Sequence, residues 1–79
     1  MRVLKEFTKK DIRISVFSWN GKYLIKYEQG MIEQTYKVSE LDVLEEKDLE
    51  VFFEEVFLDE INKRFEEMHQ SLRNQTENI

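Results

Sequence analysis

The dipeptide Asn20-Gly21 lies between two runs of alternating apolar and polar residues. Asn-Gly is the strongest short-range indication of a two-residue β-hairpin turn, because both central positions of that turn need a positive φ angle. Closing the turn with Trp19 opposite Lys22 fixes the pairing of the two strands and sorts their side chains onto two faces, one of them apolar. The other pairs that this register predicts are Ser18–Tyr23, Phe17–Leu24, Val16–Ile25, Ser15–Lys26, Ile14–Tyr27 and Arg13–Glu28.

A second turn follows the hairpin, and two positions are open for it. A turn at Gln29-Gly30 sets Lys26 opposite Glu33, which is a favourable pair of charges. A turn at Gly30-Met31 sets Glu28 opposite Glu33, which brings two like charges together. We therefore predict the turn at Gln29-Gly30.

With either turn, a third strand of about residues 31–38 adds Ile32, Tyr36 and Val38 to the apolar face, because a shift of two residues keeps each side chain on its side. Residues 1–10 fit either a short helical turn or an extension of the first strand. A three-stranded antiparallel meander with one apolar face is not stable alone in water. We therefore expect the rest of the chain to cover this face.

The second half of the sequence has helical character. Ser39, followed three positions later by Asp42, is a weak form of a capping box and predicts a short helix to about Glu46. Asp48 is a candidate cap for a second helix. Residues 49–73 then read as one long helix of about 39 Å, with no glycine or proline to interrupt it.

The apolar stripe on this long helix changes side near its middle. At about 100° per residue, the two parts of the stripe are centred about 150° apart. The first part consists of Leu49, Phe52, Phe53 and Val56, and the second part consists of Leu58, Ile61, Phe65, Met68 and Leu72. Either the helix bends or breaks near residues 57–59 and folds back onto its own domain, or its second part meets another subunit.

The lengths of the predicted elements favour the second explanation. Strands of about 23 Å are too short to cover a helix of about 39 Å, and a small monomer seldom leaves a large apolar patch open. We therefore expect a homodimer. Its predicted contact residues are Leu58, Ile61, Phe65, Met68 and Leu72.

Size and composition fit one small domain. The chain has 79 residues, no cysteine and a net charge of −5, and we expect a single α+β domain over residues 1–73 with a frayed tail at residues 74–79. Residues 1–38 carry a net charge of +4 and residues 39–79 one of −9, so the two halves can attract each other. No stretch resembles a signal peptide or a membrane span, so we expect a soluble cytoplasmic protein that does not bind membranes.

Few residues point to catalysis or metal binding. His69 is the only histidine, and Glu66 gives it the Glu-x-x-His spacing of di-iron bundles, but such a site needs more carboxylates and a second histidine. Acids such as Asp59 and Glu60 are followed four residues later by bases, which is typical of a solvated helix surface. The sequence contains no glycine-rich phosphate loop, nucleophile elbow or Cys-His set. We therefore predict that the protein is not an enzyme and has no catalytic residue, metal or cofactor.

The outer face of the predicted sheet is the one place with the character of a binding surface. Basic and aromatic residues alternate there, as they do on sheets that stack single-stranded bases. The same residues also fit a local cluster that stabilises the end of the hairpin, or a contact with a protein partner. The candidate binding residues are Arg13, Phe17, Trp19, Lys22, Leu24, Lys26 and Lys37.

The order strand-strand-strand-helix over about residues 11–70 is similar to that of the purine-rich-element-binding repeat, a dimer-forming binder of single strands that has an additional strand. The resemblance covers topology only and no motif matches, so no functional residue is carried over. From sequence we predict a non-catalytic binding or adaptor module, a homodimer that acts through protein contacts. The alternative is single-stranded nucleic-acid binding through the outer sheet face.

Overall fold

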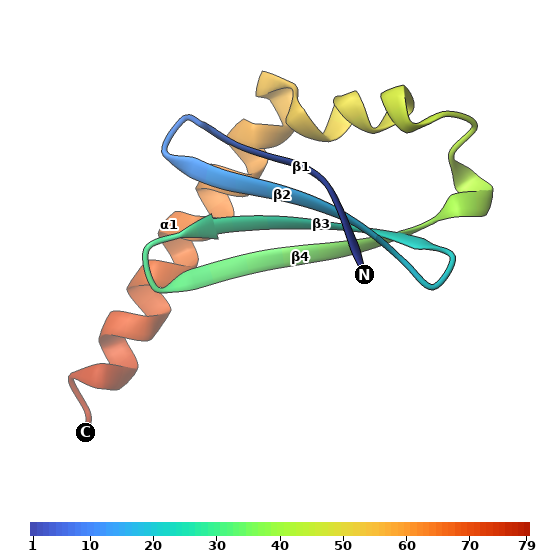
Figure 1. Ribbon diagram of the computed structural model, residues 1–79. Helices are drawn as coiled ribbons and strands as arrows, with labels where there is room; N and C mark the ends of the chain where they lie inside the picture. The colour runs from blue at the N-terminus through green and yellow to red at the C-terminus, as the bar shows by residue number, and fades with distance from the viewer.

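The structure is a computed structural model that describes residues 1–79. Four antiparallel strands follow one another in a meander and are followed by helical segments (Figure 1). The elements are β1 (Arg2–Lys9), β2 (Ile12–Trp19), β3 (Lys22–Gln29), β4 (Ile32–Ser39), the 3-10 helices η1 (Glu40–Asp42) and η2 (Glu46–Phe53), and α1 (Glu55–Thr76). The sequence therefore correctly predicts an α+β chain with an antiparallel sheet and a C-terminal helix, but with one strand too few.

The missing strand is β1, at the N-terminus. It pairs with β2 through a two-residue turn in which Lys10 and Asp11 both have a positive φ, of 53° and 63°. Neither residue is a glycine, so the turn carries no strong sequence signal. The β1–β2 register shifts at Leu4, so that Val3 lies opposite Phe17 on the outer face.

The β2–β3 hairpin has the predicted register, with Trp19 opposite Lys22 and Arg13 opposite Glu28. Asn20 and Gly21 both have a positive φ, of 53° and 75°. The alternating pattern and the Asn-Gly turn therefore fix this pairing correctly.

The prediction for the β3–β4 turn is wrong. The central residues of the turn are Gly30 and Met31, and Glu28 lies opposite Glu33. Gly30 has a φ of 59°, so the turn places the residue that tolerates this angle at its first central position. Lys26 offsets the like charges, since its Nζ lies 3.5 Å from Glu28 Oε1 and 3.7 Å from Glu33 Oε2.

The observed register also improves the apolar face. Ile25 lies opposite Tyr36, and Tyr23 lies opposite Val38. In the predicted register, Ile25 would have faced the amide of Gln34. Cross-strand aromatic and aliphatic pairs contribute up to about 1 kcal/mol of stability each. This gain outweighs the repulsion between Glu28 and Glu33, which Lys26 screens.

The predicted long helix over residues 49–73 is divided in the structure. Glu54 is extended, with φ −74° and ψ 151°, and separates η2 from α1. The break lies three residues before the predicted position at residues 57–59. At the other end, α1 continues through Asn74 to Thr76.

The break allows both apolar stripes to contribute to one core. Leu49 from η2 and Phe65 from α1 belong to the same cluster of ten buried residues, with exposed fractions of 3% and 0%. Val56 is the exception and is exposed. The cluster consists of Ile12, Ile14, Val16, Ile25, Tyr27, Leu49, Phe53, Leu58, Ile61 and Phe65.

This core corrects the predicted dimer contact. Leu58, Ile61 and Phe65 are each 0% exposed inside a single chain, so they are not available to a second subunit. Met68 is only half-buried and Leu72 is 41% exposed, so these two still reach the surface. The prediction erred because it assumed one continuous helix, on which the two stripes point in different directions.

Tyr27 lies at the centre of the packing between sheet and helices. Its ring has edge-to-face contacts with Tyr36 and Phe57, and Phe57 in turn contacts Phe52. The Tyr27 hydroxyl donates a hydrogen bond of 2.9 Å to the carbonyl of Phe52. Burial raises the pKa of Tyr27 well above its usual value.

We predict that Phe65→Ala lowers the free energy of unfolding by about 3–5 kcal/mol, because it leaves a cavity in the core. The matched control is Val56→Ala on the same helix, for which we expect a loss of less than about 1 kcal/mol, since that side chain is 78% exposed. Urea unfolding followed by circular dichroism measures both. Equal losses for the two variants would contradict the placement of Phe65.

We predict that stability falls as the pH rises above about 10, where a tyrosine in the unfolded chain ionises. The pKa of Tyr27 is raised in the folded state, so the unfolded state loses its proton first and is favoured by increasing pH. One such group contributes at most about 1.4 kcal/mol per pH unit. Tyr27→Phe should flatten the alkaline limb of a plot of unfolding free energy against pH, and superimposable slopes above pH 10 would contradict this.

Candidate functional site

The outer face of the sheet brings most of the predicted binding residues together. Val3, Phe17, Leu24 and Lys37 lie side by side in one row across the four strands. Trp19 and Lys22 form the next row, beside the β2–β3 turn. Alternate residues of a strand point to the same face, so these side chains share one surface.

Arg13 and Lys26 occupy the other end of the outer face and are neutralised there. Arg13 Nη2 lies 3.6 Å from Glu6 Oε2, and Lys26 forms ion pairs with Glu28 and Glu33. The seven residues predicted from sequence therefore share a face but do not form one basic surface.

The unneutralised end is an apolar surface with two lysines, which we call the outer patch: Val3, Phe17, Trp19, Lys22, Leu24 and Lys37. Val3 is 53% exposed and Trp19 is 46% exposed, whereas Phe17 and Leu24 are half-buried. Lys22 and Lys37 take part in none of the seven ion pairs of the chain. Val3 is not among the candidate binding residues predicted from sequence, because the register shift at Leu4 that turns Val3 outward has no sequence signal.

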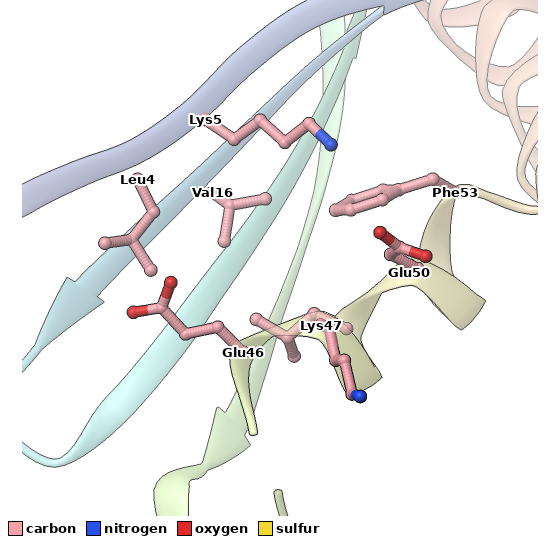
Figure 2. Close-up of a pocket in the computed structure, with 8 residues that line it drawn as sticks. Leu4, Lys5, Val16, Glu46, Lys47, Glu50 and Phe53 are labelled. Atoms are coloured by element: carbon pink, nitrogen blue, oxygen red, sulfur yellow. The ribbon is translucent and has the colours of Figure 1, made fainter.

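A small cavity lies on the opposite face of the sheet, between β1, β2 and η2 (Figure 2). It has a volume of about 190 Å³, which is below the range of typical ligand pockets. Its apolar lining comes from Leu4, Val16, Leu49 and Phe53, and its charged lining from Lys5, Glu46, Lys47 and Glu50.

The charged groups around this cavity do not converge on one point. Lys5 reaches from β1 toward the ring of Phe53, and Lys47 points away from the sheet (Figure 2). The Lys5 ammonium lies 5.1 Å and 5.3 Å from the ring centroids of Phe7 and Phe53, as in cation–π contacts. Lys5 therefore helps to hold η2 against β1.

His69 fastens α1 to the turn between β3 and β4. Its Nε2 lies 3.0 Å from Gln29 Oε1, and a Cβ on Gly30 would lie 3.6 Å from the imidazole ring. No group of three or more histidine, cysteine or acidic side chains in the structure is arranged to hold a metal ion. The Glu66-x-x-His69 spacing thus gathers no further ligands.

Attraction between the basic and acidic halves of the chain is visible in three of its ion pairs. Arg2 pairs with Glu46, and Lys10 pairs with both Glu55 and Asp59. The hydrogen bond of 3.2 Å to Asp59 is the main cause that raises the pKa of Lys10. These pairs join β1 and its turn to the helical segments.

No protein-family model, curated protein or solved structure matches the chain. No comparison therefore supports the likeness of element order to the purine-rich-element-binding repeat. No helix of the structure has both the length and the apolar character needed to cross a membrane.

Proposed function

We propose that this protein is a non-catalytic binding module that contacts a protein partner through the outer patch. The observation that carries the proposal is the division of the outer face: one end is neutralised by its own ion pairs, and the other combines exposed apolar side chains with two lysines that have no acidic partner in the chain. As part of the proposal we keep a cytoplasmic location, which fits a chain without cysteine.

The composition of the outer patch supports a protein partner. Tryptophan and other aromatic residues are enriched at the centres of protein interfaces, where they supply large contact area at low entropic cost. Contiguous exposed apolar surface with a polar rim is typical of interaction sites. Lys22 and Lys37 on the rim favour a partner that presents acidic groups beside an apolar surface.

The positions of the titratable groups support a non-catalytic role. The pKa of Tyr27 is raised by burial in the core, and the pKa of Lys10 is raised by its ion pair with Asp59 on the surface. Neither group is among the residues that line the cavity between β1, β2 and η2. His69 is engaged with Gln29, which gives it a role in fastening α1.

Single-stranded nucleic acid is the second candidate ligand. Trp19 lies opposite Lys22, and Phe17 lies in the same row as Lys37, so aromatic surfaces for stacking are adjacent to cations for phosphate groups. Two cations are few for such a surface, and the chain has a net charge of −5. We therefore place this candidate second.

The first experiment compares protein capture from a cell extract by the wild type, Trp19→Ala and Arg13→Ala. We expect the same partner to be retained by the wild type and by Arg13→Ala, which changes the neutralised end of the same face. Trp19→Ala should reduce retention at least about tenfold, as expected for the loss of a central aromatic contact. Equal retention by all three proteins would contradict a binding role for the outer patch.

The second experiment titrates a labelled single-stranded oligonucleotide at two salt concentrations and follows the fluorescence of Trp19, the only tryptophan. Nucleic-acid binding predicts a change in emission and an affinity that falls as salt rises, because phosphate contacts release counterions. For the protein-partner proposal we expect no salt-sensitive binding. A salt-sensitive interaction that Lys22→Glu abolishes would favour the second candidate instead.

A further inference from the structure

β4 is an edge strand: β3 lies on one side of it, and no strand lies on the other (Figure 1). The two-residue turn makes Gln29 and Ile32 the closing pair, which is hydrogen-bonded in such hairpins. The N–H and C=O groups of the alternate residues Glu33, Thr35 and Lys37 therefore point to the free edge. They are available to another strand.

The two edges of the sheet differ in their protection against strand pairing. Natural edge strands are blunted by bulges and by charges that point inward. β1 has both, because its register shifts at Leu4 and its lysines lie on the inner face, with Lys9 donating to the Phe53 carbonyl at 3.1 Å. β4 pairs with β3 along its length without a register shift and contains no proline. Its edge is open to pairing.

We infer that the free edge of β4 pairs antiparallel with the β4 edge of a second copy of the chain, around a two-fold axis at Thr35. This register places Glu33 opposite Lys37 of the second copy, and Lys37 opposite its Glu33. On the inner face it places Ile32 opposite Val38. The contact is thus self-complementary in charge and in apolar character, as a two-fold interface requires.

Other registers lack this match. A shift of two positions sets Glu33 or Lys37 opposite the neutral Thr35 of the second copy. A further shift sets Lys37 opposite Lys37, or Glu33 opposite Glu33, which is repulsive. Only the register centred on Thr35 pairs opposite charges. Lys37 has no ion pair within its own chain, so it is free for this contact.

The end of α1 supplies a second contact to the same partner. After His69 the helix passes the β3–β4 turn and continues away from the sheet (Figure 1). Beside β4 it leaves an open groove whose apolar lining is Ile32 and Met68, and Leu72 follows one turn later with 41% of its surface exposed. In the two-fold pair this end of α1 lies on the inner side of the second sheet, near its half-buried Val38.

The paired strands therefore explain three features that a lone chain leaves open: an edge without a bulge, a proline or an inward charge; an unpaired Lys37; and a half-exposed apolar end of α1. The homodimer expected from sequence is thus assigned to a different surface, from which Leu58, Ile61 and Phe65 are absent. The assignment does not depend on the proposed outer-patch function. In the dimer, Lys22 remains the free cation of the outer patch.

The experiment is sedimentation equilibrium over a range of protein concentrations, with circular dichroism to confirm that each variant is folded. We expect the wild type to form dimers. Thr35→Pro removes an N–H that points to the free edge, so the monomer should fold while the dimer dissociates. Glu33→Lys and Lys37→Glu should each raise the dimer Kd about tenfold, since each creates two repulsive pairs by symmetry.

The double variant Glu33→Lys/Lys37→Glu restores opposite charges across the axis and should return the dimer Kd to within about threefold of the wild type. Trp19→Ala is the matched control away from the edge, and its dimer Kd should equal that of the wild type. A wild type that stays monomeric up to about 1 mM, or a dimer that Thr35→Pro leaves intact, would overturn the inference. Either result leaves the Trp19-dependent capture of a protein partner unaffected, so the two proposals fail separately.

Discussion

The structure depends on the extended residue Glu54, which separates η2 from α1. An uninterrupted helix would direct its two apolar stripes about 150° apart, but only one face of the sheet is available to form a core with them. With the break, Leu49 and Phe53 pack over the β1–β2 side of the sheet while Leu58, Ile61 and Phe65 enter the same core. A small chain gains from this arrangement because its core is limited by its size. The Tyr27 hydroxyl, bonded to the Phe52 carbonyl at 2.9 Å, holds the chain just before the break.

The sequence predicts the parts of the fold that local chemistry determines. Asn20-Gly21 is such a case, because the turn geometry and the alternating pattern agree on one register. Local signals are weaker elsewhere. The turn at Lys10-Asp11 has no glycine, and the position of the β3–β4 turn depends on Lys26 neutralising two acids that local pairing rules count as repulsive. No proline or glycine marks the break at Glu54. We attribute the break to tertiary packing, which brings both apolar stripes into one core.

The candidate site was predictable to a similar degree and for the same reasons. The β2–β3 register places Phe17, Trp19, Lys22 and Leu24 on one surface, and this follows from the hairpin alone. The separation of Arg13 and Lys26 from that surface depends on ion pairs with residues of other strands. The inclusion of Val3 depends on the register shift in β1. Charge pairing between strands, rather than residue type, therefore decides which part of the outer face remains available for binding.

The two edges of the meander differ in how readily they can pair with another strand. Lysines on the inner face and a register shift protect β1, and η2 packs beside it, so strand addition there would disrupt contacts of Lys5 and Lys9 that the fold already uses. No comparable cost opposes strand addition at β4. Its two charged side chains, Glu33 and Lys37, lie two residues on either side of Thr35. Pairing at that edge joins the two outer faces into one continuous surface without covering Trp19, which lies on β2 beside the hairpin turn. The proposed dimer would use Lys37 at the shared edge and present two copies of the rest of the outer patch, so a partner with two matching sites would gain avidity from the pair.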